Sequence, residues 1–202
     1  AEGWNGTVSA SAKEWKLPDA ATGRVRFSAK GSKGLSFDGT VEAKETETGI
    51  AVCAEAVSTA DAKPECVAYT FELDLPAFVG WTWTVERDKG PLKGTVPAQY
   101  GKMSLFVGPA TALSLTSPDG KKGYRWTFPE QRPITFQDNR QWGQTLSVRI
   151  GSRPRTFAKG TKVRMPFVVS ALGGQTLGSL KPHVVSAGGE GGSVDLRKNI
   201  VP

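Results

Sequence analysis

Hydrophobic and polar residues alternate in short runs along most of the chain. In residues 145–150, for example, Leu146, Val148 and Ile150 alternate with polar side chains. Side chains along a β-strand point to opposite faces in turn, so this spacing predicts a strand with one buried and one solvent-facing side. Further strands are predicted at residues 7–12, 24–29, 35–43, 66–73, 81–87, 102–107, 112–117, 124–128, 134–138 and 163–169.

Turn-forming residues separate these runs. The 202 residues include 24 Gly and 13 Pro, at intervals that leave few windows long enough for a helix, so an all-helical fold is excluded. Short strands with such turns, at spacings of about 8–12 residues, are typical of antiparallel sandwiches. We therefore expect an all-β protein: an antiparallel β-sandwich of two packed sheets with roughly a dozen strands.

One domain is expected over most of the chain, because no linker-like segment divides it between Gly34 and Leu172. The β-sandwich domain is assigned to residues 1–172. Residues 173–202 contain seven Gly. We expect them to form edge strands or a tail that leads towards a further module.

Two cysteines bear on the redox compartment. Apolar residues occupy every second position in residues 50–56 and again in residues 66–73, which predicts a hairpin of two strands. The alanine-rich residues 51–62 also permit a short helix. Cys53 and Cys66 fall on the more polar faces of the two runs and enclose twelve residues. A disulfide between them would contribute about 3 kcal/mol and implies an oxidising compartment. The alternative is two reduced thiols that pack as small hydrophobic groups.

The beginning of the chain is consistent with export. It starts at Ala1 rather than Met, as expected of a mature secreted protein and equally of a cloned fragment. No apolar run approaches the roughly 18 residues of a membrane span. Together with the cysteine pair, these features predict a secreted or periplasmic protein.

The net charge of +7 is unevenly distributed. Residues 1–101 carry 11 Lys/Arg against 14 Asp/Glu, a net of −3, whereas residues 102–202 carry 15 against 5, a net of +10. A positive second half favours anionic partners such as acidic polysaccharide or nucleic acid. Nucleic acid is not expected, because its binding surfaces usually add exposed aromatic residues among the charges. A soluble surface that is simply basic is the alternative.

The sequence lacks the residues of most enzyme classes. His183 is the only histidine, so a zinc site built from several histidines is excluded, and a Ser-His-Asp triad would need this residue as its base. No phosphate-binding loop, dinucleotide fingerprint or calcium loop occurs. We therefore expect no metal and no cofactor.

The densest group of polar and aromatic residues is Gln137-Asp138-Asn139-Arg140-Gln141-Trp142-Gly143. Carboxylate, amide and guanidinium groups suit sugar hydroxyls, and an indole offers a flat apolar face to a pyranose ring. The candidate ligand contacts are therefore Asp138, Arg140, Gln141 and Trp142. The alternative is structural, with a turn at Asp138, an ion pair between Asp138 and Arg140, and Trp142 in the core.

Two arginines are candidates for long-range attraction of an acidic glycan. Arg149 and Arg164 each lie between two apolar residues of an alternating run, so both are expected on outward faces. If the strands that carry them pair with each other, the two guanidinium groups share one face of a sheet.

The stretch from about Tyr69 to Leu172 resembles a known class of domain. Its motifs are, in order, Thr70-Phe71-Glu72-Leu73, Pro76, Arg125-Trp126, residues 134–143, Ser147-Val148-Arg149-Ile150, and Lys159-Gly160 before an apolar strand. These motifs are similar to the N-terminal accessory β-sandwich domains of large secreted bacterial glycoside hydrolases. The likeness covers about half the chain, and only the Gln-Asp-Asn-Arg-Gln-Trp run is specific. It implies an ancillary module beside a catalytic domain of the full-length protein.

The expected function is that of a non-catalytic exported module that works with polysaccharide-processing machinery and binds carbohydrate, with an acidic glycan as ligand. An enzyme is the alternative. It would be a glycosidase with Glu130 and Asp138 as its carboxylate pair, or a uronate lyase that uses Tyr124 with nearby arginines. A purely structural or adhesive domain is the third interpretation.

Overall fold

The computed structural model describes residues 24–30, 36–61, 67–152, 157–173, 183–184 and 194–195, and the fold is described for these residues. The elements are β1 (Arg24–Lys30), β2 (Ser36–Thr46), β3 (Gly49–Ser58), β4 (Val67–Asp74), α1 (Leu75–Phe78), β5 (Thr82–Glu86), β6 (Leu92–Thr95), β7 (Ser104–Thr116), β8 (Gly123–Asp138), β9 (Thr145–Ser152), β10 (Lys162–Leu172), β11 (His183–Val184) and β12 (Val194–Asp195). The expected all-β class is confirmed. Across the described ranges, no helix is long and apolar enough to cross a membrane.

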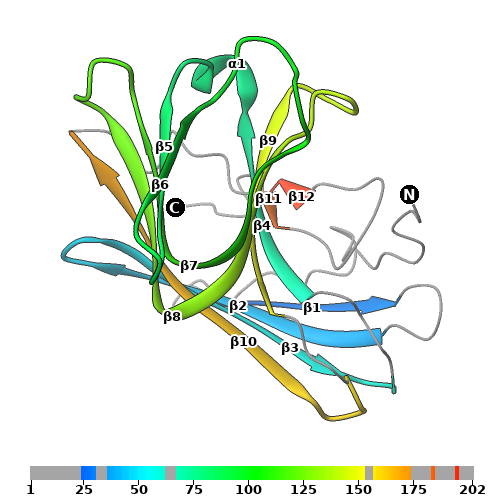
Figure 1. Ribbon diagram of the computed structural model, residues 1–202. Helices are drawn as coiled ribbons and strands as arrows, with labels where there is room; N and C mark the ends of the chain where they lie inside the picture. The colour runs from blue at the N-terminus through cyan, green and yellow to red at the C-terminus, as the bar shows by residue number, and fades with distance from the viewer. Residues whose placement is uncertain are drawn as a thin grey trace.

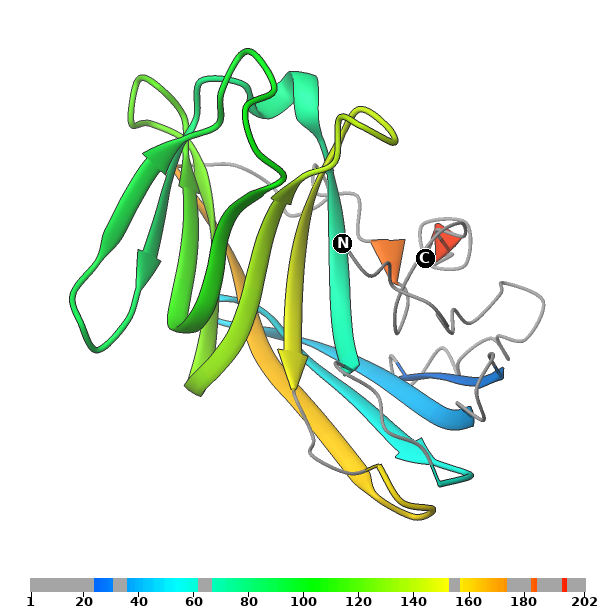
Figure 2. The ribbon, with the colours of Figure 1, turned by 45° about the vertical axis from the view of Figure 1, so that its right-hand side comes forward.

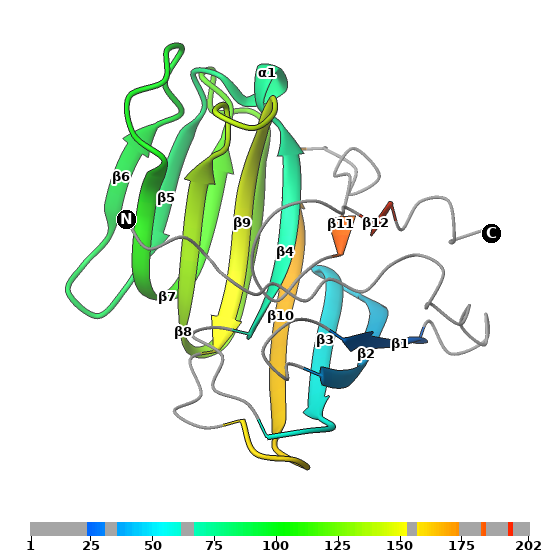
Figure 3. The ribbon, with the colours of Figure 1, turned by 90° about the vertical axis from the view of Figure 1, so that its right-hand side faces the viewer.

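Ten strands form one hydrogen-bonded antiparallel network that folds into two layers (Figure 1). The wide layer has the order β1-β2-β3-β10-β8-β7-β5-β6, and the narrow layer contains β4 and β9 beside β8. β8 joins the layers, because residues 123–127 pair with β10 and residues 134–138 pair with β9. β11 and β12 form a separate pair, and β11 lies near β4 (Figure 3).

The β7–β8 hairpin bends where it passes from one layer to the other. Pairing jumps from Ala110 opposite Arg132 to Ala112 opposite Thr127, so residues 128–131 oppose a single residue of β7. An insertion of this kind bends a strand and increases its twist. As a result β5 and β6 stand on one side of the curved sheet and β9 and β4 on the other (Figure 1). β10 and β3 extend past the lower tip of β9 (Figure 2).

The sequence predicts two strands in each arm of this hairpin, but the structure has one. Residues 102–107 and 112–117 merge into β7, and residues 124–128 and 134–138 merge into β8. Prolines interrupt the alternation at the corner, which is typical of strand ends. Here Pro129 lies in the insertion, whereas Pro109 and Pro133 oppose each other within the ladder, beside the last pair before the register shift.

The core lies between the inner faces of the two layers. Phe71 of β4 packs edge-to-face against Trp126 of β8, with ring centroids 5.8 Å apart. Tyr69 packs against Phe167 of β10 at 5.2 Å. Trp126 is completely buried, and so are the alternating residues of β9 predicted to face inward: Leu146, Val148 and Ile150.

The predicted hairpin between residues 50–56 and 66–73 is wrong, and residues 51–58, for which a short helix was the alternative, belong to β3. β3 pairs with β2 and β10, whereas β4 pairs with β9 in the other layer. The alternation of apolar and polar residues determines which side chains of a strand face inward, but it does not determine which other strand pairs with that strand.

Three predictions fall on residues that the structure does not describe. Cys53 lies on β3 and forms no disulfide with a described residue, but its predicted partner Cys66 lies outside the described residues, so the Cys53–Cys66 disulfide stays a prediction. The strand at residues 7–12 also lies outside them. The domain boundary at residue 172 likewise stays a prediction, because only two short strands of residues 174–202 are described.

Candidate functional site

Three connections meet at one end of the sandwich, at the top of Figure 1. They are α1 with residues 79–81, residues 96–103, and residues 139–144, and together we call them the loop end. Backbone hydrogen bonds join the connections. The Leu75 N–H donates to the Gln144 carbonyl at 3.0 Å, and the Gly80 N–H donates to the Val96 carbonyl at 2.9 Å. The loop end is therefore one hydrogen-bonded unit.

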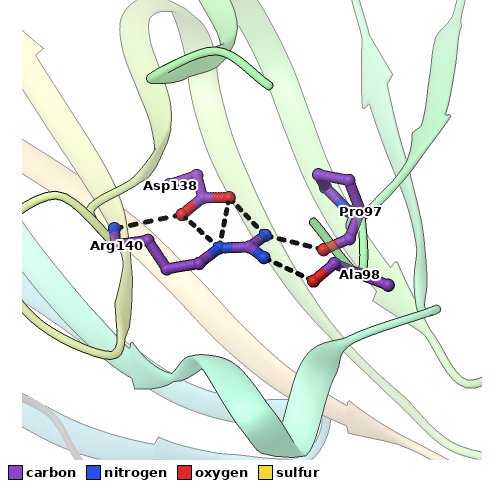
Figure 4. A network of polar contacts seen from close by, with 4 residues as sticks. All are labelled: Pro97, Ala98, Asp138 and Arg140. Carbon is purple, nitrogen blue, oxygen red and sulfur yellow. Dashed lines mark hydrogen bonds and ion pairs between the residues drawn. The ribbon is translucent and has the colours of Figure 1, made fainter. Parts of the chain in front are cut away.

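The base of the loop end holds a buried ion pair (Figure 4). Asp138 is completely buried at the end of β8, and the Arg140 side chain is only 13% exposed. Oδ1 of Asp138 accepts from the Arg140 backbone N–H at 3.1 Å and from Nε at 3.0 Å, and Oδ2 accepts from Nε at 3.0 Å and Nη2 at 2.6 Å. The carboxylate is thus satisfied by one residue two positions along the chain.

The same guanidinium group reaches across to the neighbouring loop (Figure 4). Nη2 of Arg140 donates to the Pro97 carbonyl and Nη1 donates to the Ala98 carbonyl, both at 2.6 Å. Hydrogen bonds to the Asp138 carboxylate raise the pKa of Arg140, so the group is charged at any physiological pH. Arg140 therefore clamps residues 96–103 to residues 139–144.

The turn after Asp138 directs Trp142 outward. The Asn139 N–H donates to the Thr145 carbonyl, and the Asn139 carbonyl accepts from the N–H groups of Trp142 (2.8 Å) and Gly143 (3.0 Å). Nδ2 of Asn139 also donates to Oγ of Ser147, which is fully buried. These bonds hold the turn at its base, while Trp142 at its tip is 65% exposed.

The structure therefore separates the four predicted contacts into two kinds. Asp138 and Arg140 form the ion pair of the structural alternative, and their polar atoms face each other and the backbone. Gln141 and Trp142 face solvent, so the core position considered for Trp142 is wrong. Sequence reasoning missed Tyr100, which is 37% exposed on the other clamped loop. A single tyrosine in a turn gives no pattern that would reveal it.

The two outlying arginines lie on different layers. Arg149 of β9 is half-buried between Thr70 of β4 and Thr135 of β8. Arg164 lies on β10, which pairs with β3 and β8. Since β9 and β10 do not pair with each other, the expectation of a shared sheet face is wrong.

Neighbouring groups offset part of the positive charge of Arg164. Its Nε lies 3.4 Å from Oε2 of Glu55, and its Nη2 lies 3.6 Å from Sγ of Cys53. Contact with Cys53, and then the charge of Glu55, raise the pKa of Arg164. Glu55 offsets only part of this charge, because Lys162 shares the same carboxylate at 3.2 Å.

The geometry opposes both enzyme alternatives. Residues 132–137 of β8 are paired with β7, and Asp138 is paired with β9, which puts about 20 Å of strand between Glu130 and Asp138. A glycosidase pair needs roughly 5–10 Å, and Glu130 is already bound to Arg132 at 2.7 Å. Tyr124 is buried and stacks on Trp81, with centroids 6.2 Å apart, so a polymer has no access to its hydroxyl.

Comparisons with known proteins do not assign the chain to a family. No family model matches the sequence, and no curated protein matches it. Among solved structures, the chain is similar to a galactose mutarotase-like protein from Lactobacillus casei, with 14% identity and a TM-score of 0.46, over 78% of this chain and 72% of that one. The β-sandwich expected from the accessory-domain resemblance is present, and membership of those domains stays a prediction.

Proposed function

We propose that the loop end binds carbohydrate, with Trp142 as a stacking platform and Gln141 as a polar contact. The chain is then a non-catalytic module that works beside polysaccharide-processing enzymes outside the cytoplasm. The single observation that carries the proposal is the 65% exposure of Trp142 on a turn with a buried base. Tryptophan is enriched at binding interfaces, because its ring combines a large apolar face with a polar N–H group.

Rigidity supports this role. A ligand that binds a mobile loop pays to order it, whereas a preorganised loop avoids that cost. The turn at residues 139–144 is anchored by Asn139, and the Arg140 clamp fixes it to residues 96–103. The indole is therefore presented on a fixed frame, as stacking on a flat sugar ring requires.

The proposal changes the roles of Asp138 and Arg140. Both were candidate ligand contacts, but their hydrogen bonds are directed at each other and at the Pro97 and Ala98 carbonyls. We assign them as positioning residues. Their loss should weaken binding through the loop rather than through a lost contact.

Binding titrations test the proposal. Wild type and Trp142→Ala are titrated with neutral oligosaccharides by calorimetry, after near-ultraviolet circular dichroism shows that both are folded. Truncation of a central tryptophan anchor costs about 2 kcal/mol or more, so we expect at least a roughly 30-fold loss of affinity. Trp142→Phe, which keeps a flat ring, should retain most of it.

Val107→Ala is the matched control, because Val107 is 51% exposed on β7 and belongs to none of the three connections. It should bind like wild type. Equal affinity of wild type and Trp142→Ala for every oligosaccharide that binds would refute the proposed site.

A further inference from the structure

A concave feature lies away from the loop end, on the outer face of the β5–β6 hairpin. It is an open pocket of about 400 Å³ lined by Thr84, Glu86, Arg87, Pro91 and Lys93. Because Trp83 and Val85 face the core, their neighbours Thr84 and Glu86 point to the outer face. The pocket adjoins the turn at residues 87–91, at the opposite end of the hairpin from α1 (Figure 3).

The one carboxylate in this pocket is neutralised by β8. Nη1 and Nη2 of Arg125 donate to Oε1 and Oε2 of Glu86, both at 2.8 Å. Nη1 of Arg125 also donates to Oγ of Ser114 at 3.3 Å. Two parallel bonds between a guanidinium and a carboxylate make a strong, oriented pair. Glu86 therefore contributes little net charge.

The two cations of the pocket have no such partner. Arg87 donates from Nε to the Gly90 carbonyl at 3.0 Å, which positions its guanidinium group beside the turn. Within the part of the chain that the structure describes, no ion pair joins Arg87 or Lys93 to a carboxylate. Asp88 and Lys89, in the turn itself, offset one another. The pocket thus keeps two uncompensated positive charges.

Hydroxyl groups continue from the pocket across the sheet. Strand register aligns one outward residue from each of five neighbouring strands: Lys93, Thr84, Ser114, Arg125 and Ser170. Neighbouring strands are about 4.8 Å apart, so this row is about 19 Å long. In this row Ser114 is buried and accepts from Arg125, so the half-buried Thr84 is the hydroxyl that remains for a ligand beside the pocket.

We propose that this outer face binds the carboxylate of an acidic sugar polymer, at a site separate from the loop end. Arg87 and Lys93 take the oxyanion, since a guanidinium fork matches a carboxylate and an ammonium adds charge. Thr84, which lines the pocket, is placed for a sugar hydroxyl. Nucleic acid fits less well, because Leu92 is the only large hydrophobic residue exposed on the described hairpin and no aromatic ring is there to stack on bases. The inference does not depend on Trp142.

The test is a titration of the full chain with trigalacturonate, a matched neutral galactose trimer, a sulfated heparin-derived oligosaccharide and single-stranded DNA. Wild type should bind trigalacturonate better than the other three. Arg87→Gln/Lys93→Gln should lose at least about tenfold in affinity and most of the salt dependence. Because Arg87 also supports the turn, Lys93→Gln alone is a second variant, with a smaller loss in the same direction.

Lys44→Gln/Lys159→Gln removes the same charge from exposed positions on β2 and beside β10, and should bind like wild type. Trp142→Ala should also keep its affinity for trigalacturonate, so failure of this proposal is distinguishable from failure of the loop end. An equal loss in both double variants, or no loss in Arg87→Gln/Lys93→Gln, would overturn the site. Tighter binding of DNA or of the sulfated sugar would overturn the assigned ligand.

Discussion

At the scale of single residues, the most consequential contact is the ion pair between Asp138 and Arg140. Removing two charges from water is costly, and a buried pair tolerates it only when its hydrogen bonds are satisfied. Here the carboxylate accepts four bonds from Arg140, and the guanidinium group also bonds the Pro97 and Ala98 carbonyls. The pair therefore stabilises the loop end rather than contacting a ligand.

Removal of the guanidinium group should destabilise the protein strongly. Arg140→Ala leaves the Asp138 carboxylate buried and unpaired, at an expected cost of about 3–5 kcal/mol. For a chain of this length the melting temperature should fall by about 10 °C. Arg24→Ala, which breaks an exposed pair with Glu42 at 3.6 Å, should cost less than about 1 kcal/mol. Similar losses in the two variants, measured by thermal and urea unfolding, would contradict the assigned role.

Tyr69 gives the fold a dependence on alkaline pH. Burial in the core raises the pKa of the Tyr69 hydroxyl well above its usual value. The folded state therefore keeps a proton that the unfolded chain loses above about pH 10. The contribution of Tyr69 to the free energy of unfolding is fully present below about pH 10 and decreases as the pH rises further. Tyr69→Phe should flatten that decline in urea midpoints between pH 9 and 11, and an unchanged slope would count against the explanation.

At the scale of elements, the β5–β6 hairpin depends on a close contact between an indole and a glycine. Gly94 lies directly opposite Trp83 in the antiparallel ladder. A Cβ atom at Gly94 would stand 2.3 Å from the Trp83 ring, so only glycine allows the indole to lie flat across its neighbour. This packing turns Thr84 and Lys93 outward and shapes both faces of the hairpin.

Gly94→Ala should therefore displace the Trp83 ring or separate the strands. Overpacking of this kind typically costs about 1–3 kcal/mol, and the near-ultraviolet dichroism of the tryptophans should change. Gly101→Ala is the matched control, because nothing lies within 4 Å of the Cβ position there. It should be neutral within about 0.5 kcal/mol. Equal unfolding midpoints for the two variants would show that the indole relaxes freely.

The strands themselves could be predicted from the sequence, because alternation reports directly on burial. Residues 145–150 and 163–169 became β9 and β10 with the expected inward faces. Pairing could not be predicted, since β3 and β4 have compatible patterns but lie in different layers. The corner of β8 was read as two strand ends, because proline marks both ends and bends.

The candidate site was only partly visible in the sequence. The run around Trp142 has sugar-binding residue types, but only the structure shows that Asp138 is completely buried and Trp142 is exposed. The pocket on the β5–β6 hairpin was missed, because Thr84, Arg87, Lys93 and Arg125 come together only through strand pairing.

At the scale of the whole molecule, the two proposed sites occupy different parts of the sandwich. The loop end lies at the Thr82 end of β5, and the pocket lies at the Glu86 end of the same strand. Changes at sites that share no contacts are usually additive. We therefore expect Trp142→Ala and Arg87→Gln/Lys93→Gln to impair different ligands without affecting each other.

The most direct test of the central claim is nuclear magnetic resonance of the indole N–H groups. Protein labelled with ¹⁵N-tryptophan is titrated with a neutral oligosaccharide that binds. The Trp142 signal is identified from its loss in Trp142→Phe. The Trp142 signal should shift progressively with ligand concentration, while those of the buried Trp83 and Trp126 stay fixed. A neutral oligosaccharide that saturates the protein without moving the Trp142 signal would contradict the proposed site.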